Sequence, residues 1–367
     1  MKKGYYIHFQ GRSSIGVSKK IDMQMEEFSR YFEIKELEVP TPVRPLIQRL
    51  FGLFPTASIA RDYKETFKEL DNPDFIYVRR TVADRKYVKF WKKVKEKYPD
   101  CKIIIEIFTY PYDKDDFAKW NAWSFYIKEL IYRRNLKKYV DRFVTYTDDK
   151  EIFGVPTICT TNGVNVDKIE MVKGEYQENK ITLIGVAYMQ RQHGYERVIE
   201  GLAEYYKSKA NRYVVELLLI GDGPEKSKYQ EMVQKYYLQD YVKFYPNMYS
   251  PQLDEMYDAS DIALAAFGMY KVGVKRLAAL KTRECLAKGM PIITGCKIDV
   301  LDEHYKFVKN FPNNAQSIDI GEVVKFYETI KQENADKKTV ASSIREFAVQ
   351  NVSMKSVMRP IVDYIES

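Results

Sequence analysis

The stretch that decides the fold is Leu280-Lys281-Thr282-Arg283-Glu284-Cys285-Leu286-Ala287-Lys288-Gly289-Met290-Pro291-Ile292-Ile293, which predicts a short helix, a glycine stop and an apolar strand. A helix that begins among Lys, Thr and Arg offers free backbone N–H groups and a positive dipole end, which together suit a phosphate. Lys281 and Thr282 are the expected phosphate partners. Glu284 is expected in the first turn, within reach of a ribose hydroxyl. The residues alone equally allow Glu284 to be a carboxylate that only complements the helix dipole.

The length and composition of the chain predict two α/β domains. A chain of 367 residues is too long for one ordinary hydrophobic core, and 45% hydrophobic with 30% charged residues fits a globular protein. The net charge of +8 is spread along the sequence rather than gathered in blocks. This distribution indicates attraction to phosphates or to an anionic membrane surface, and no nucleic-acid motif accompanies it.

The cysteines and the terminal sequence predict a cytoplasmic protein. Four cysteines, none of them closely paired, indicate reduced thiols rather than a zinc site. Met1-Lys2-Lys3-Gly4 runs directly into a strand pattern without a cleavable signal, and no apolar stretch is long enough to span a membrane. Any membrane contact is therefore expected to be peripheral, at the cytoplasmic face.

Strand and helix patterns alternate through the first half of the chain, as in a parallel, doubly wound sheet. An apolar strand is predicted over Tyr5–Phe9, a polar loop follows up to Gly16, and Val17–Tyr31 has helical spacing. Because such a loop lies at the carboxyl end of the first strand, Gly16 is a candidate for lining a ligand site, although it equally suits a tight turn. Further strands are expected over 74–79, 101–107 and 142–147, and residues 158–164 close this half of the chain.

Two segments of this half carry more specific hypotheses. Residues 44–55 mix basic and large apolar side chains and suit either a lipid surface or, with more weight, a short helix packed on the sheet. The loop at 108–113, which contains Tyr110, is rich in aromatic and hydroxyl groups. It suits a sugar-facing surface and a packed turn equally well.

After a polar linker at 173–180 the pattern restarts with a strand at 181–187, which predicts a second domain. The helix that follows carries Val198, Ile199, Leu202 and Tyr206 on one face. Another buried strand ends at Gly221-Asp222-Gly223-Pro224, where the glycines would allow close backbone approach to a ligand, although a bare turn uses them too. Residues 347–365 predict a terminal amphipathic helix.

The ordered series 185–202, 218–224, 242–244, 253–264 and 283–291 resembles the two-domain GT-B glycosyltransferases, specifically the retaining family-4 enzymes that build bacterial surface polysaccharides such as capsule and exopolysaccharide. The resemblance covers nearly the whole chain. It implies two Rossmann-like domains facing a cleft, an acceptor-side domain at 1–174, a nucleotide-sugar domain at 175–345 and a crossover helix at 346–367 that packs on the first domain.

The resemblance also implies roles for individual residues. Glu284 matches the carboxylate that hydrogen-bonds the donor ribose, while Gly221 and the Asn247-Met248 turn match positions near the nucleotide base. The family's second Glu corresponds to Arg276 here. Its diphosphate-clamping Arg and Lys correspond roughly to Tyr188 and His193, so Arg191, Lys281 or Arg276 is expected to supply the positive charge.

The implied reaction is metal-independent transfer of a sugar, with retention, from a nucleoside diphosphate donor to a hydroxyl acceptor. The donor is expected to be a UDP-sugar acting as substrate, with no cofactor and no metal. The acceptor is expected to be a saccharide or a lipid-linked saccharide. Tyr110, in the loop where the family has a sugar-contacting His, and His193 are the candidate catalytic residues, with a phosphate-contacting or structural role favoured over a base role for His193.

Two other functions fit the same residues. The departures at Arg276 and His193 suit a catalytically weak, nucleotide-sugar-binding scaffold subunit of a polysaccharide assembly complex. A GT-B-shaped epimerase that acts on a free nucleotide sugar is a third reading, and it would need acidic catalytic groups that the sequence does not place.

Overall fold

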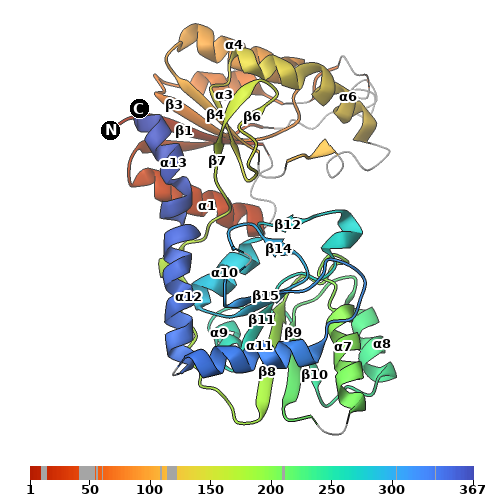
Figure 1. The fold of residues 1–367 in the computed structure, drawn as a ribbon. Helices are drawn as coiled ribbons and strands as arrows, with labels where there is room; N and C mark the ends of the chain where they lie inside the picture. Colours follow the sequence, from red (N-terminus) through yellow and green to blue (C-terminus); the bar gives the residue numbers. More distant parts are fainter. Residues whose placement is uncertain are drawn as a thin grey trace. The chain divides into compact units, whose positions relative to one another are not determined.

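The chain forms two compact units, the first around a mostly parallel β-sheet and the second around a parallel one (Figure 1). The first unit comprises Met1–Thr161 and Met354–Ser367, and the second comprises Asn162–Ser353. The structure is a computed structural model that describes residues 1–9, 15–40, 54, 57–59, 61–107, 110–113, 122–208, 211–302, 304–334 and 336–367.

In the first unit, the described residues form a seven-stranded sheet in the order β2-β1-β3-β4-β5-β7-β6. Its strands are β1 (Lys3–His8), β2 (Glu33–Glu38), β3 (Phe75–Arg79), β4 (Lys102–Ile107), β5 (Arg142–Thr145), β6 (Glu151–Ile152) and β7 (Val155–Cys159). All neighbouring strands are parallel except the β6–β7 pair. Its helices are α1 (Ile15–Ser29), α3 (Tyr63–Glu69), α4 (Arg85–Lys97), α6 (Trp123–Tyr132), the 3₁₀ helix η2 (Arg133–Lys138) and α13 (Met354–Glu366).

Alternate side chains along these strands point to two separate layers of helices, as period-two alternation requires. On one face Ile76 and Ile103 pack against α3 and α4, where Trp91 is fully buried. On the other face Tyr77 packs against Phe28 of α1, with ring centroids 5.1 Å apart. Burial on both faces explains the nearly continuous apolar runs by which these strands were predicted.

The second unit has a six-stranded sheet, within the described residues, in the order β10-β9-β8-β11-β13-β15. Every pairing in it is parallel. Its strands are β8 (Lys180–Val186), β9 (Val214–Ile220), β10 (Val242–Tyr245), β11 (Ile262–Leu264), β13 (Ile292–Thr294) and β15 (Val308–Asn310), and a separate parallel pair is β12 (Arg276–Leu277) with β14 (Lys297–Ile298).

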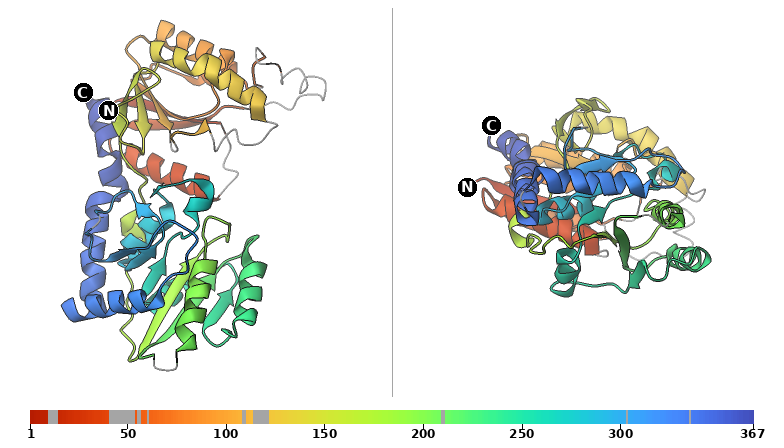
Figure 2. Two further views of the ribbon diagram at one scale, coloured as in Figure 1. Left: turned by 45° about the vertical axis from the view of Figure 1, so that its right-hand side comes forward. Right: turned by 60° about the horizontal axis from the view of Figure 1, so that its bottom comes forward.

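The helices of the second unit cover both faces of its sheet (Figures 1 and 2). They are α7 (Glu196–Lys207), α8 (Lys226–Lys235), α9 (Gln252–Asp258), α10 (Leu280–Lys288), α11 (Ile320–Glu333), α12 (Lys337–Asn351) and the 3₁₀ helices η3 (Val166–Lys168) and η4 (Met269–Val272). Val198, Ile199 and Leu202 of α7 are buried, as predicted, and Tyr206 stacks on Tyr241.

The terminal apolar stretch forms two helices, whereas the sequence pattern predicted one over 347–365. The backbone N–H of Val164 donates to Val352 O at 2.9 Å, and Val164 also bridges to Ser353, so the chain is held extended where α12 ends. After this break α13 packs on α1 in the first unit. Lys102 Nζ donates to Tyr364 O at 2.8 Å near the end of α13.

The unit boundaries lie at 161/162 and 353/354, against expected domain boundaries at 174/175 and 345/346. The segment after Asn162 is fastened to the second unit by Arg345 of α12, whose guanidinium donates to Val166 O and Ile169 O at 2.7 and 2.6 Å. Val172 adds an apolar contact to the same core. These long-range contacts have no counterpart in the polar composition by which a linker was predicted.

Candidate functional site

The candidate site lies at the carboxyl edge of the second sheet. Because all its strands are parallel, the loops that follow β8, β9, β10, β11 and β13 emerge at one edge, where open α/β sheets bind ligands. These loops and the start of α10 hold nine of the eleven candidate residues. Tyr110 and Gly16 belong to the first unit.

Helix α10 confirms the predicted sequence of helix, glycine stop and strand. Its C-cap, Gly289, has φ +79°, and Met290 N–H donates to Cys285 O at 2.9 Å, which closes the helix. A Cβ on Gly289 would lie 2.5 Å from Ala341 O of α12, so the position requires glycine for packing as well as for its backbone angle. β13 then begins after Pro291.

The placement of Glu284 in the first turn of this helix was wrong. The helix begins at Leu280 with Ala279 as its N-cap, and no acidic residue lies in its first turn. Glu284 is therefore the fifth helical residue and begins the second turn, half-buried. Ala279 supplies no side-chain cap, and the first turn holds no acid. The positive end of the helix dipole is therefore not balanced by a side chain of that turn.

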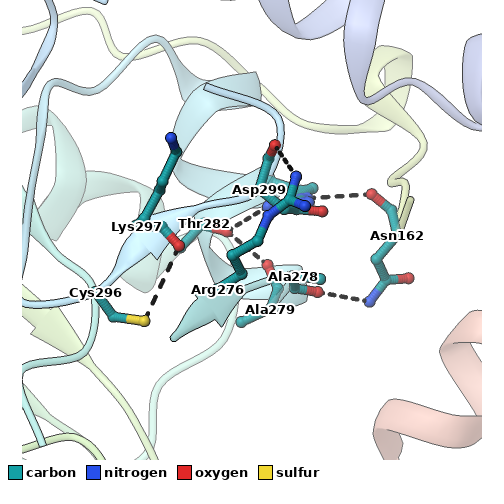
Figure 3. A network of polar contacts seen from close by, with 9 residues as sticks. Asn162, Arg276, Ala278, Ala279, Thr282, Cys296, Lys297 and Asp299 are labelled. Atoms are coloured by element: carbon teal, nitrogen blue, oxygen red, sulfur yellow. Dashed lines mark hydrogen bonds and ion pairs between the residues drawn. The ribbon is translucent and has the colours of Figure 1, made fainter. Parts of the chain in front are cut away.

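A buried polar network occupies the other side of the same turn (Figure 3). Arg283 is fully buried and forms an ion pair with Asp299, while its Nε donates to Asn162 O at 3.1 Å. Its Nη1 donates to Thr282 Oγ1 at 3.0 Å, and that hydroxyl donates to Ala279 O at 2.7 Å. The network rigidly orients the start of α10.

Thr282, one of the two expected phosphate partners, is thus committed to the protein interior through its hydroxyl and is 2% exposed. A ligand at the helix end would meet its backbone rather than its side chain. Arg283 was not singled out from the sequence, since adjacent Arg and Glu residues gave no sign of which one faces inward. The partner Asp299, sixteen residues later, supplies that information only in the fold.

Lys281 and His193 meet at a small pocket. The pocket, about 50 Å³ in volume, is lined by both side chains together with Tyr195, Met269 and Cys285. The volume suits a few waters or one small polar group rather than a whole nucleotide sugar. The pKa of Lys281 is lowered mainly by burial, although part of its side chain remains exposed, so the cation on this wall is incompletely solvated.

His193 is held as a neutral imidazole. Its Nδ1 accepts the backbone N–H of Gln190 at 3.0 Å, which places the proton on Nε2. Burial and the positive charge of Lys281 lower its pKa to about 4. At neutral pH it is therefore a hydrogen-bond donor through Nε2 and a weak base. This geometry favours the phosphate-contacting role that the sequence suggested over the role of base.

The glycines at Gly221 and Gly223 serve packing between loops. Both have positive φ, and Cβ atoms on them would lie 2.0 Å from Ala187 O and 2.5 Å from Met189 N. Met189 N–H donates to Asp222 O at 2.5 Å across the same contact. Their small size therefore brings the loop after β9 against the loop after β8, and close approach to a ligand is not needed to explain them.

The remaining candidates of the second unit are spread along this edge. Arg191 is exposed in the loop before α7. Asn247 is exposed in the turn after β10, while Met248 packs on the apolar cluster that includes Ile220. Arg276 is exposed on β12, and its Nη2 donates to Asp299 O at 3.1 Å (Figure 3).

In the first unit, helix α1 begins two residues earlier than predicted, so Gly16 lies within its first turn rather than in the preceding loop. Gly16 is exposed. Tyr110 is half-buried, with its ring edge-on to Tyr112 and Phe153 at centroid distances of 6.2 and 6.0 Å. Burial raises the pKa of its hydroxyl. Residues 10–14, 44–53, 55 and 108–109 of the hypotheses above lie outside the described residues.

The described part of the chain holds no group of three His, Cys, Asp or Glu side chains arranged to bind a metal ion. The cysteines are free thiols. None of the helices in the described ranges combines the length and apolar character that crossing a bilayer requires.

Comparison with solved structures identifies the fold. A glycosyltransferase from Rickettsia africae ESF-5 is 12% identical, with a TM-score of 0.62 over 100% of this chain and 98% of that chain. Sucrose-phosphate synthase from Thermosynechococcus elongatus is 13% identical, with a TM-score of 0.61 and coverages of 100% and 98%. The chain has the GT-B fold. This result confirms the predicted α/β class with two Rossmann-like domains.

A further solved structure and one family model resemble this chain. The lipopolysaccharide outer core galactosyltransferase WaaB is 13% identical, with a TM-score of 0.59 and full coverage of both chains. Residues 153–297 match the family model described as "Glycosyl transferases group 1", a segment that contains all nine candidates of the second unit. No curated protein matches the sequence. The family match and the shared fold support a GT-B glycosyltransferase.

Proposed function

We propose that this GT-B chain transfers a sugar, with retention and without a metal, from a nucleoside diphosphate donor to a hydroxyl acceptor. The observation that carries the proposal is the start of α10: an uncapped helix end with Lys281 and neutral His193 on one wall and Glu284 one turn along. The donor is proposed to be a UDP-sugar, bound mainly by the second unit. The acceptor is proposed to be a saccharide or lipid-linked saccharide of a bacterial surface polysaccharide, recognised by the first unit.

The proposed chemistry assigns one task to each group. The helix dipole, Lys281 and the Nε2–H of His193 stabilise the charge that develops on the leaving diphosphate. Glu284 accepts a hydrogen bond from the ribose. The leaving oxygen and the incoming hydroxyl share one face of the sugar, so no side chain acts as a nucleophile. Arg191 and Arg276 are proposed as additional cations at the same edge, and Tyr110 as a contact on the acceptor side.

Binding measurements with nucleotide fragments test the donor site. For Lys281→Ala we expect UDP affinity to fall about 10- to 100-fold, the range expected for a hydrogen bond to a charged group, with uridine affinity unchanged. Glu284→Gln should also lower the affinity for UDP, and this loss of affinity should be smaller for the deoxyribose analogues of UDP, which lack a ribose hydroxyl. Lys235→Ala on α8 is the matched control. Equal loss of UDP and uridine binding in Lys281→Ala would contradict the phosphate role.

The scaffold function remains the second candidate because of Arg276. Where an acid was expected, this side chain is a cation that donates to Asp299 O. Release of UDP, followed with a panel of nucleotide sugars and hydroxyl acceptors, separates the two functions. A transferase gives product whose anomeric configuration matches the donor by NMR, whereas donor binding without turnover across the panel favours the scaffold.

A further inference from the structure

Helix α6 of the first unit buries polar side chains and exposes several apolar ones. Trp123, Tyr126, Ile127, Leu130 and Ile131 follow the i, i+3, i+4, i+7, i+8 spacing of one helical face. The side chains of Trp123, Leu130 and Ile131 are nevertheless 45%, 42% and 48% exposed. We call these five residues the α6 apolar face. Exposed apolar side chains gathered on one helix face are typical of a surface that contacts a partner or a membrane.

Polar contacts on the opposite side fix this orientation. Ser124, Lys128 and Glu129 are the buried residues of α6. The Glu129 carboxylate accepts the Tyr112 hydroxyl at 2.6 Å and the Ala83 backbone N–H at 2.5 Å. Rotating α6 to bury its apolar side would break these buried hydrogen bonds, which is costly. The helix is therefore anchored with its apolar face outward.

A dense group of cations adjoins this face. Figures 1 and 2 show α4 beside α6, and α4 packs against both α6 and η2. A shallow groove between α4 and η2 is lined by four lysines and two acids: Lys92, Lys95, Lys137, Lys138, Glu96 and Asp141. One lysine of the groove, Lys95, pairs with Asp141 at 2.9 Å. The exposed charged residues of α4 and η2 are six basic and one acidic on α4, with three basic on η2: Arg85, Lys86, Lys89, Lys92, Lys93, Lys97, Glu96, Arg134, Lys137 and Lys138.

We propose that the α6 apolar face and the cations of α4 and η2 together form a docking surface for an anionic lipid bilayer. The apolar side chains enter the boundary between headgroups and acyl chains, and the lysines pair with lipid phosphates. Charge decides between a bilayer and another apolar partner. Nine cations against one acid beside an apolar stripe match a surface of many separate negative charges. Residues 44–55, for which a lipid contact was the less favoured of two interpretations, are a different segment.

This surface belongs to the first unit and includes none of the donor-site candidates. Its failure and the failure of the proposed transferase are therefore distinguishable. Variants of the surface should keep their UDP affinity, whereas variants of α10 should keep their lipid binding.

Co-sedimentation of the full chain with vesicles tests the proposal. Vesicles of phosphatidylcholine with phosphatidylglycerol should bind the protein, binding should weaken as salt rises, and pure phosphatidylcholine vesicles should bind poorly. Each lysine at an anionic surface contributes roughly fivefold, so Lys93→Gln/Lys137→Gln/Lys138→Gln should weaken binding by roughly 100-fold. The variant Leu130→Ser/Ile131→Ser should weaken it at least tenfold at every salt concentration.

Matched controls on the second unit make the result specific to this face. Lys207→Gln/Lys235→Gln/Lys243→Gln removes the same charge from exposed positions. Val214→Ser/Val349→Ser removes apolar side chains that are 45% and 46% exposed. Thermal unfolding verifies that each variant folds. Equal binding by surface and control variants would overturn the proposal, as would wild-type protein that ignores anionic vesicles. A self-association that Leu130→Ser/Ile131→Ser abolishes, without any vesicle binding, would replace it with an interface between copies.

Discussion

At the scale of single residues, His193 couples the pocket to pH. Folding lowers its pKa from 6.5 to about 4 through burial and the nearby Lys281, so the unfolded chain binds more protons between these values. The unfolding free energy should therefore decrease as pH falls from about 6.5 to about 4. Because the side chain is only partly buried, we expect a loss on the order of 2 kcal/mol.

Chemical denaturation across this pH range measures the loss. His193→Asn removes the titrating ring and can retain an acceptor for Gln190 N–H, so it should flatten this part of the profile. His304→Asn, at an exposed position, is the control and should leave the profile unchanged. A wild-type profile that stays flat between pH 6.5 and 4 would show that His193 is not desolvated in the folded chain.

The sequence predicted the element that carries the candidate residues more reliably than it predicted the contacts of their side chains. The helix that carries residues 281–284 was predicted, but the hydroxyl of Thr282 bonds Ala279 and Arg283, and Glu284 starts the second turn rather than the first. The spacing along a helix decides such details, and a shift of one residue in the helix start changes which side chain faces a ligand. Gly221 became a candidate because glycine-rich loops often bind ligands, but in the structure its Cα packs closely against the backbone of Ala187.

At the scale of elements, the C-terminal end of α10 is the strictest position of the candidate site. Gly289 at φ +79° and Gly273 at φ +72° carry similar backbone strain if replaced, about 1–2 kcal/mol. A Cβ on Gly273 meets nothing within 4 Å, whereas one on Gly289 meets Ala341 of α12. Gly289→Ala should therefore destabilise the protein by roughly 1–3 kcal/mol more than Gly273→Ala.

Urea unfolding of the two variants isolates the contact between α10 and α12, because the backbone strain is matched. Donor binding followed in parallel should weaken in Gly289→Ala, since the helix end proposed to face the phosphates shifts with α10. Equal free energies of unfolding for the two variants would mean that α12 moves to accommodate the added methyl group. The packing of α10 on α12 would then not be as tight as proposed.

Elements with a strong apolar signal were predicted, and elements that depend on distant partners were missed. The buried strands β3 and β4 were predicted from their apolar and β-branched residues. Strand β2, with the sequence EIKELE, lies at a sheet edge with mostly polar residues, and only its pairing with β1 defines it. The break between α12 and α13 likewise depends on Val164, far away in the sequence.

At the scale of the whole molecule, the two units differ in how the chain builds them. The second unit is a single continuous segment, Asn162–Ser353, whereas the first needs α13 from the C-terminus. The apolar face of α13, including Val357, Ile361 and Ile365, is buried, and Lys2 Nζ donates to Ile365 O and Glu366 O. A helix that buries six side chains stabilises its unit substantially.

This asymmetry predicts how fragments of the chain behave. A fragment of residues 162–353 should unfold cooperatively on its own and bind UDP, because it contains its complete sheet and the start of α10. Residues 1–161 alone should be markedly less stable than the same unit in the full chain, since the surface that α13 covers becomes exposed. Adding a peptide of residues 354–367 should restore stability in a concentration-dependent manner.

Circular dichroism and calorimetric titration of the fragments with UDP and with the peptide check these outcomes. A peptide with Val357, Ile361 and Ile365 replaced by Ser is the control, because it retains the length and charge but loses the buried face. If 1–161 were as stable without α13 as with it, the returning helix would serve only as a connection. If 162–353 folded without binding UDP, the donor site would need residues of the first unit, and the assignment of the donor to the second unit alone would fail.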